Sequence, residues 1–573
     1  MTGSSWAVET PPSRRYPVYT RLNANDVMPD PITPLGASLV WIPHILPGWG
    51  NAYIKLDSFT PAELAGEEAS PVAGFMYGYL YINQTCGRII GIRAGIGAEA
   101  VDAAFFSTNS PAHVPSPSDV NEELSARMAQ RLQWALTTTS FPELDEDREI
   151  ADRERAHRPD LRTATDEALV ARARSMAPLQ RLMWRGEVIA GNQASVGPGV
   201  IASLLGDADP TLVVRLVGHT SDVDSALPSF ALWDLSRTVR EDPALTAAFD
   251  SGLNGLLQRL RTDHPDYADR FDAFVREFGY RGPSEWDIGV HSWETSPELP
   301  LALIDRLRCL ADDASPSARR EQPEAQAAAA LAEALQMLGS NEEAVQTLHM
   351  AIASARRFAA WRERGKTNAV KLIHEVRAPL FELGRRLVER GELDQPQQVF
   401  MALESELDTL AIGGASMHET LRQREKDWAE LFDIDPPTWV TSSEPLTAIE
   451  ELPRKSAKDA AKVRPGDVLA GAPASAGIAR GRARVIHDIT QIASFEPGEI
   501  LVAPQTDPSW TPLFMVASAV VVDVGAMGSH AMIVSRELGV PCAAGVTDAT
   551  ARIPDGTMLE VDGSSGRVTV LEG

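Results

Sequence analysis

One histidine, His530, stands in a glycine-rich turn whose residues suit phosphoryl chemistry. The stretch GAMGSHAMIVSRELGVPC covers residues 525–542. It predicts a helix that begins beside His530, with Ser529 as its N-cap, and ends at Gly539. The first helical turn gathers unpaired N–H groups and the positive end of the helix dipole, so negative charge on this imidazole would be stabilised. One hypothesis is therefore a nucleophilic histidine that carries a phosphoryl group on a ring nitrogen.

The same residues leave an alternative open, in which His530 is a capping or core histidine. A metal site is not supported, because no second His, Cys or carboxylate lies at ligand spacing around it. The secondary structure that must position the histidine can also be predicted from the sequence. The run AVVVDV (519–524) predicts a buried strand leading into the turn at Gly525. Similar short β-branched runs with glycine between them predict a compact, strand-rich domain at 468–573.

This C-terminal domain resembles the mobile phosphohistidine domain of phosphoenolpyruvate-utilising enzymes. The matching blocks are GAPASAGIARGRARVI (471–486), GEILVAPQTDPSWTPLF (498–514), GAMGSHAMIVSRELGVPCAAGV (525–546) and IPDGTMLEVDGSSGRVTV (553–570). The resemblance implies a swivelling β/β/α domain that is phosphorylated on His530. The residues that match the family's phosphohistidine loop are Gly525, Gly528 and Ser529. Many members have two glycines at the loop start and a Thr or Leu before the Ser, where this chain has Ala526 and Gly528.

The middle of the chain is similar to the acceptor-binding region of rifampin phosphotransferase and its neighbours. The matching segments are GHTSDVDSALPSFALWDLSRTVR (218–240), FGYRGPSEWDI (278–288) and residues 365–407, with ITPLGASL (32–39) nearer the N-terminus. Apolar residues at three- and four-residue spacing in 121–136 and 166–186 predict helices. We therefore expect a multidomain α+β protein with an acceptor-binding region at 1–432. Residues 1–120 should be mixed, with strands in GFMYGYLYIN (74–83), and residues 121–432 largely helical, with a helix closing at Gly391.

The source of the phosphoryl group is expected on another chain. We expect no barrel domain of phosphoenolpyruvate users after the histidine domain, and residues 1–120 contain no GxxxxGK[ST] loop or recognisable ATP-grasp pattern. This combination is similar to the two-protein aryl phosphate synthases, such as phenylphosphate synthase and the 4-cresol-phosphorylating enzyme. That resemblance implies a separate ATP-grasp subunit holding ATP with Mg²⁺, and no tightly bound cofactor here. The β-phosphate of ATP would pass to His530, with release of AMP and phosphate.

Transfer to a hydroxyl passes through a loose transition state that needs cations on the phosphoryl oxygens and a base for the acceptor proton. Arg281 in YRGPSE is the candidate cation, because a guanidinium binds phosphoryl oxygens bidentately. The alternative is a surface arginine paired with Glu277 or Glu285. The candidate bases are Glu285 and His219. His219 lies beside Asp222 and Asp224 in the sequence, so a carboxylate could orient it, and Asp222 is also a candidate substrate-binding residue; a solvated turn histidine fits His219 equally well.

An apolar pocket should hold the acceptor, which we expect to be a phenol such as an alkylphenol. The candidate lining residues are Trp233, Tyr280, Trp286 and Trp293. Tryptophans in helical segments more often belong to a core, so that alternative stays open. Two other functions also stay open: a rifampin-like antibiotic phosphotransferase, and a phosphohistidine carrier or regulatory protein.

The segment 433–467 predicts a flexible linker, since it combines Pro, Ser and mixed charge without an apolar period. A flexible chain of that length reaches about 30 Å. That reach would let the histidine domain swing between the ATP site of the partner and the acceptor site.

The composition excludes several classes of function. The 573 residues carry a formal charge of −26 from 53 basic and 79 acidic residues, which argues against nucleic acid as a partner. Three separated cysteines without a CxxC pair fit a reducing, cytoplasmic location. We find no signal peptide and no run near the ~18 apolar residues that span a bilayer, so we expect no membrane association.

Overall fold

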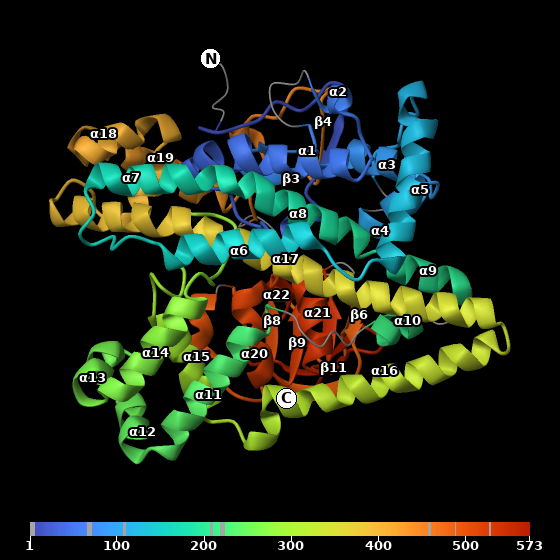
Figure 1. The fold of residues 1–573 in the computed structure, drawn as a ribbon. Helices are drawn as coiled ribbons and strands as arrows, with labels where there is room; N and C mark the ends of the chain where they lie inside the picture. The colour runs from blue at the N-terminus through green and yellow to red at the C-terminus, as the bar shows by residue number, and fades with distance from the viewer. Residues whose placement is uncertain are drawn as a thin grey trace. The chain divides into compact units, whose positions relative to one another are not determined.

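The computed structural model describes residues 6–65, 71–106, 110–206, 210–217, 224–455, 460–487, 489–525 and 529–572. The chain divides into two compact units. Unit 1 comprises Met1–Gly197, Trp286–Val290 and Ala353–Asp459, and unit 2 comprises Pro198–Glu285, His291–Ile352 and Ala460–Gly573. Two helices, α9 (Val196–Leu205) and α17 (Glu342–Glu389), contribute residues to both units. Each unit combines helices with a sheet of its own, which confirms the multidomain α+β class (Figure 1).

Unit 1 contains a four-stranded antiparallel sheet in the order β2-β3-β1-β4. Its strands are β1 (Val18–Thr20), β2 (Ala73–Met76), β3 (Tyr79–Asn83) and β4 (Trp439–Thr441). Strands β2 and β3 form a hairpin over the predicted strand run, and Tyr77 and Gly78 make its turn with φ of 57° and 80°. Strand β4 pairs with β1 although it lies in the predicted linker 433–467. Some of that segment therefore belongs to unit 1, and the predicted domain boundaries stay predictions.

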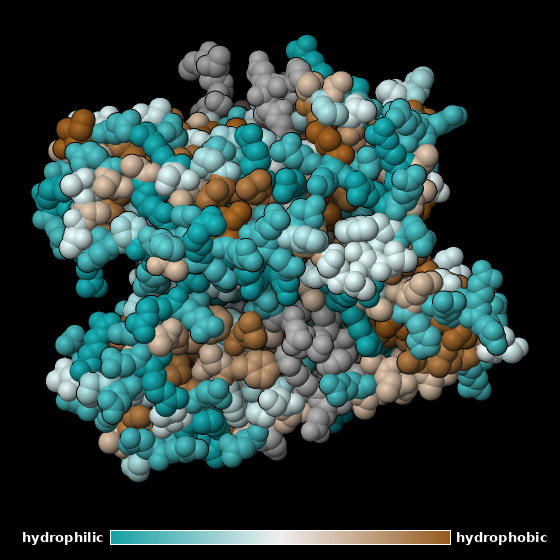
Figure 2. All heavy atoms as spheres, in the orientation of Figure 1, coloured by the Kyte–Doolittle hydropathy of each residue, from teal (hydrophilic) through white to brown (hydrophobic). Residues whose placement is uncertain are grey.

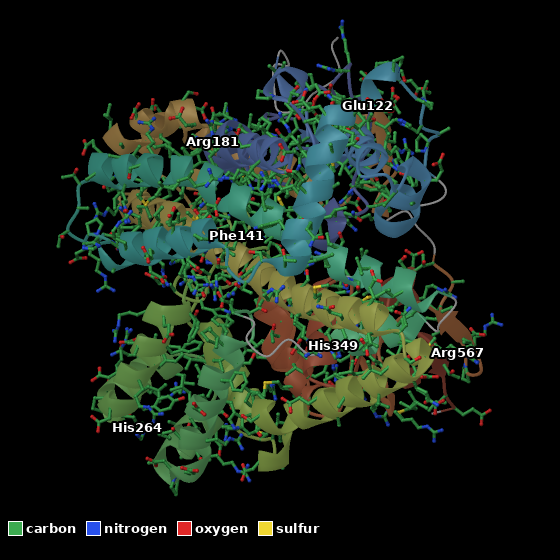
Figure 3. All side chains as sticks on the ribbon, turned by 45° about the vertical axis from the view of Figure 1, so that its right-hand side comes forward. Glu122, Phe141, Arg181, His264, His349 and Arg567 are labelled. Atoms are coloured by element: carbon green, nitrogen blue, oxygen red, sulfur yellow. The ribbon has the colours of Figure 1, made fainter. Side chains whose placement is uncertain are left out.

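The helices of unit 1 bury their apolar faces around tryptophans. They are α1 (Leu46–Lys55), α2 (Pro61–Leu64), α3 (Gln84–Arg93), α4 (Ala98–Phe105), α5 (Glu122–Thr137), α6 (Pro142–Ala156), α7 (Asp166–Met176), α8 (Gln180–Gln193), α18 (Leu407–Ile412) and α19 (His418–Leu431), together with the residues of α17 that belong to this unit. The helix predicted at 121–136 is α5. The helix predicted at 166–186 is two, because the pattern is interrupted at Pro178. Phe141, labelled in Figure 3, lies 5.9 Å from the ring centres of both Trp134 and Trp361.

One helical stretch of the described chain, residues 166–205, is long and apolar enough to cross a bilayer. It comprises α7, α8 and α9 rather than one continuous helix. Met183 and Trp184 within it are fully buried in the core of unit 1. Core helices of soluble proteins pass the same test, so the stretch is weak evidence for a membrane span. Hydrophilic residues cover most of the face shown in Figure 2.

Unit 2 combines helices from the middle of the chain with an eight-stranded mixed sheet in the order β5-β12-β11-β7-β8-β9-β10-β6. The strands are β5 (Val468–Ala470), β6 (Ala472–Ser475), β7 (Ile478–Val485), β8 (Ile500–Ala503), β9 (Ala519–Val522), β10 (Cys542–Ala544), β11 (Met558–Asp562) and β12 (Arg567–Val570). The helices are α10 (Pro210–Val217), α11 (Leu227–Glu241), α12 (Pro243–Asp250), α13 (Leu256–Asp263), α14 (Pro265–Phe278), α15 (Glu298–Leu307), α16 (Pro316–Leu338), α20 (Thr511–Val516), α21 (His530–Glu537) and α22 (Ala549–Arg552).

The central strands of unit 2 are buried on both faces. Strands β7, β8, β9 and β10 pair in parallel, and every residue of β8 and β9 is buried, as parallel strands covered on both sides require. Val520 and Val522 belong to one hydrophobic cluster with residues of α11, α14, α15, α20 and α21, whereas Ala519 and Val521 belong to a second cluster with β11, β12 and α22. The first cluster joins the predicted histidine domain to the helices between 227 and 307.

Candidate functional site

His530 is the first residue of α21, as the sequence predicts. The buried strand β9 delivers the chain to the turn, and Gly525 suits that turn because a Cβ there would lie 2.9 Å from the Ala544 side chain. The helix closes at Gly539, whose φ is 63° and whose N–H donates to the carbonyl of Arg536. The imidazole therefore stands where the N-terminal turn of a helix meets the carboxyl end of a parallel strand.

Two threonine hydroxyls hold the His530 ring. Thr506 Oγ1 lies 3.0 Å from Nδ1, and Thr511 Oγ1 lies 3.1 Å from Nε2. Both threonines are buried, and the Phe514 ring packs edge-on at 5.8 Å. A hydroxyl both donates and accepts, so either tautomer of the imidazole satisfies both contacts. A ring nitrogen attacks phosphorus only with its lone pair uncovered, so phosphorylation requires one threonine hydroxyl to move aside.

The predicted side-chain cap of α21 is absent from the described residues. Ser529 occupies the N-cap position with an extended backbone, at φ −63° and ψ 156°, but its side chain makes no capping hydrogen bond. Its Oγ is buried and has no hydrogen-bond partner among the residues that the structure describes. The prediction of a Ser529 cap is wrong in this respect, because position fixes the backbone but not the side-chain rotamer.

The motif YRGPSE (280–285) forms a tight, buried turn. Arg281 Nη1 donates to Glu285 Oε1 at 2.9 Å, and the two side chains are 1% and 3% exposed. Gly282 is required there, since a Cβ would lie 2.4 Å from the carbonyl oxygen of His291. Ser284 adopts a φ of 45°, in the left-handed region. Arg281 is thus paired with Glu285, one of the two expected partners, but the pair is buried rather than at the surface.

Asp507 connects this motif to the histidine. Its Oδ2 accepts a hydrogen bond from the Ser284 N–H at 3.0 Å, and its Oδ1 accepts from the Ser509 N–H at 2.8 Å. The residue before it is Thr506, which contacts His530. Burial, reinforced by the negative charge of Glu285, raises the pKa of Asp507 to about 7. One guanidinium therefore shares this region with two carboxyl groups, and one of these titrates near neutral pH.

The four aromatic candidates occupy two different cores. Trp233 and Trp293 are buried in the hydrophobic cluster of unit 2, and Tyr280 is buried beside Arg281, at 5.1 Å from the guanidinium. Trp286 belongs to unit 1, where its ring lies 4.6 Å from that of Trp184. All four side chains are as buried as core residues. Their assignment to an acceptor pocket stays a prediction.

Three predicted residues, His219, Asp222 and Gly528, lie outside the described residues. Among the described residues, no group of three or more His, Cys, Asp or Glu side chains is arranged to hold a metal ion.

A second polar cluster, on α17 in unit 1, was not predicted from the sequence. Glu363 lies 3.6 Å from Arg362 and 3.4 Å from Lys366. Glu187 faces the same helix, and burial raises its pKa while Lys366 and Arg362 oppose that shift. Gly365 allows this approach, because a Cβ there would lie 2.9 Å from the Cα of Glu187. The sequence does contain a signal for this cluster. Arg362, Glu363 and Lys366 are charged residues spaced within about one turn of the helix, so their side chains can interact.

Two family models each match a part of the chain. Residues 184–363 match the fourth domain of rifampicin phosphotransferase, and residues 495–566 match the mobile domain of PEP-utilising enzymes. These matches confirm the predicted resemblances of the C-terminal domain to the mobile domain and of the middle of the chain to rifampin phosphotransferase. The mobile-domain match contains Thr506, Asp507, Thr511 and His530, whereas the rifampicin phosphotransferase match contains the YRGPSE turn.

Three relatives illustrate the range of similar proteins. An uncharacterized protein of Mycobacterium tuberculosis is 26% identical over 598 residues, covering 100% of this chain and 63% of that protein. A rifampicin phosphotransferase of Streptomyces sviceus is 31% identical over 53% of this chain and 34% of its own length. The prodigiosin synthesizing transferase PigC of Serratia marcescens is 30% identical over 63% of this chain and 40% of its own length. The chain thus spans less than two thirds of each of these relatives.

Proposed function

We propose that this chain is a phosphotransferase component that carries a phosphoryl group on His530 and delivers it to the hydroxyl of a small phenol. The observation that carries the proposal is the link from His530 through Thr506 and Asp507 to the turn that holds Arg281 and Glu285. The two matched families support the same reaction class. Relatives named rifampicin phosphotransferase also pass phosphate to an acceptor, as their name states.

The mechanism has two stages, the charging of His530 and the transfer to the acceptor. In the first, a ring nitrogen of His530 attacks the β-phosphorus of ATP, an N–P bond forms, the P–O bond to the α-phosphate breaks and AMP leaves. Water then attacks the γ-phosphorus of the resulting diphosphohistidine, the P–O bond between the β- and γ-phosphates breaks, and inorganic phosphate leaves. In the second, the acceptor oxygen attacks the phosphohistidine, an O–P bond forms and the N–P bond breaks. The acceptor proton passes to a base, for which Glu285 is our candidate. Arg281 would stabilise charge on the transferring oxygens.

ATP and its Mg²⁺ would be bound by an ATP-grasp partner, and we assign no ligand of that metal to this chain. The similarity to two-protein aryl phosphate synthases supports this arrangement. The two reaction partners then meet His530 in turn, which agrees with the swivelling that the resemblance implies. A cytoplasmic location is included in the proposal.

A drug-sized acceptor is the second candidate function. It is favoured by the match of residues 184–363 to a rifampicin phosphotransferase domain. Rifampicin and simple phenols can be offered to the same charged protein, so one experiment separates the two acceptors.

The test charges His530 without its natural donor. Potassium phosphoramidate phosphorylates reactive histidines directly, so wild type, His530→Ala and His349→Ala can be charged and then given phenol, 4-methylphenol or rifampicin. His349, exposed on α17, is the matched control (Figure 3). We expect aryl phosphate by phosphorus NMR from wild type and His349→Ala, and none from His530→Ala. Equal product from His530→Ala would overturn the proposal.

A second arm tests the donor. ATP labelled at the β- or the γ-phosphate is mixed with Mg²⁺, an ATP-grasp protein and this chain. We expect the β-label on His530 and the γ-label in free phosphate. A γ-label on His530 without the β-label contradicts the proposed first step while leaving the second step intact.

A further inference from the structure

A narrow pocket lies along the face of α21 that carries His530. Ile533, Val534, Glu537 and Leu538 line it. They follow His530 by three, four, seven and eight residues, the spacing of a single helical face. The opposite wall of the pocket includes Ala226, which directly precedes α11, and Ser229 and Phe230 of that helix. The pocket therefore lies between the histidine helix and a helix of the segment matched to rifampicin phosphotransferase.

Thr511 connects the pocket to the reactive ring. It lines the pocket, and its Oγ1 contacts His530 Nε2 at 3.1 Å. If this hydroxyl moves aside, Nε2 loses its cover on the pocket side. As it stands the pocket admits only water-sized molecules, so a larger ligand enters as Thr511 or Phe230 shifts.

Ser229 supplies a polar group inside this pocket. Its side chain is 2% exposed, and its Oγ has no hydrogen-bond partner among the described residues. A buried hydroxyl without a partner is unfavourable, because it has given up its hydrogen bonds to water and gained none in return. Ser236 on the same helix shows the contrast, since its equally buried hydroxyl donates to the Trp233 carbonyl at 2.7 Å. The unmet hydroxyl of Ser229 points to a polar ligand group.

We infer that this pocket is the acceptor site, and that it takes a single-ring hydroxyl compound bearing a second hydrogen-bonding group for Ser229. The inference rests on the proposed function. The face of α21 from His530 to Leu538 is about 12 Å long, at ~1.5 Å per residue. That length suits one aromatic ring with its substituents. The walls are otherwise largely apolar, and an apolar pocket with few placed polar groups is typical of small-ligand sites.

The test separates charging from acceptor binding. Wild type, Ala226→Phe, Ser229→Ala and Ser236→Ala are charged with phosphoramidate, and the phosphohistidine at residue 530 is measured by mass spectrometry. Each charged protein then receives hydroquinone, which has a second hydroxyl, or 4-methylphenol, which has none. Initial rates of transfer and the melting temperature of each variant are recorded.

We expect Ala226→Phe to charge normally and to transfer at least 10-fold more slowly to both phenols, because the ring fills the pocket. Ser229→Ala should raise the KM for hydroquinone about 5- to 10-fold, as for one lost hydrogen bond, with little change for 4-methylphenol. Ser236→Ala should match wild type.

Normal transfer by both Ala226→Phe and Ser229→Ala would overturn the pocket assignment and leave the proposed function standing. A wild-type protein that charges but transfers to neither phenol would instead remove the proposed phenol function, and the pocket assignment with it.

Discussion

Two buried ionic clusters in this protein have opposite charge balance. In unit 2 a single guanidinium, Arg281, shares its surroundings with the carboxyl groups of Glu285 and Asp507. In unit 1 the fully buried carboxylate of Glu375 lies within 4.0 Å of three guanidinium groups. These belong to Arg155, Arg158 and Arg172. Among the residues that the structure describes, carboxyl groups outnumber guanidinium groups in the first cluster, and guanidinium groups outnumber the carboxylate of Glu375 in the second.

The difference teaches which cluster can respond during a reaction. Glu375 ties α17 to Arg172 of α7 and to Arg155 and Arg158 at the end of α6, and removing any one arginine leaves the others in place. Such redundancy suits a structural role. In the unit 2 cluster, burial, reinforced by the negative charge of Glu285, raises the pKa of Asp507 to about 7 and so keeps it close to its titration point at neutral pH. A dianionic phosphohistidine near this turn would be repelled less if Asp507 were protonated. Proton uptake by Asp507 could therefore offset the negative charge of the phosphoryl group.

The largest expected effect breaks the unit 1 cluster. Glu375→Gln leaves three largely enclosed guanidinium groups without their shared, fully buried carboxylate and should cost about 3 to 5 kcal/mol of unfolding free energy. The matched control is Glu389→Gln on the same helix, whose ion pair with Arg385 is exposed and should contribute about 1 kcal/mol or less. Urea denaturation measures both. Equal losses would mean that Glu375 is not the centre of a structural cluster.

The next effect sharpens the functional side. Arg281→Lys keeps the charge but loses the planar donor pair, so we expect phosphoryl transfer from charged His530 to slow about 100-fold, the scale of one transition-state hydrogen bond. Arg270→Lys, an exposed arginine of α14 that donates to Thr238, is the control and should transfer at the wild-type rate. Single-turnover rates measure the loss. An unchanged rate in Arg281→Lys would assign Arg281 a structural role like that of the unit 1 arginines.

The smallest effect concerns pH. The pKa of Asp507 is raised from an unfolded value near ~3.9 to about 7, so the folded protein binds the extra proton between these values. The contribution of Asp507 to stability therefore falls as pH rises through this window. Asp507→Asn has no such ionisation, although it gives up an acceptor for the Ser284 N–H at every pH.

The contrast between Asp507→Asn and wild type therefore lies in how their difference in stability changes with pH. The melting temperature of Asp507→Asn relative to wild type should rise by about 5 to 10 °C between pH 5 and pH 8, the change that roughly 2.5 kcal/mol produces in a unit of this size. Calorimetry at the two pH values measures it. A difference that stays constant with pH would show that Asp507 is ionised throughout.

Local patterns predicted the elements of the site, and long-range packing decided its contacts. The helix at His530 and its end at Gly539 follow from residues within one or two turns of each other, which a sequence displays directly. The hydrogen bond between Asp507 and Ser284 joins residues 223 positions apart, and no spacing rule reports it.

Burial was the other feature that the sequence concealed. Arg281 is a charged residue in a motif that predicts a turn, and such residues are usually exposed. The side chains of Arg281 and Glu285 are nevertheless almost completely buried. Trp286 lies only one residue after that motif but packs in unit 1 with Trp184. A chain that passes between two cores within a few residues defeats any assignment based on sequence neighbourhood.

The strand order of unit 2 also governs how the domain assembles during synthesis. Strand β5 opens this domain and pairs with β12, whose first residue, Arg567, is labelled in Figure 3. The two strands lie roughly 100 residues apart in sequence, so closing the sheet means closing a long loop late. A ribosome must therefore release nearly the whole histidine domain before its edge is sealed. Until then the half-made sheet exposes unpaired strand edges, and the nascent chain is most open to aggregation in that interval.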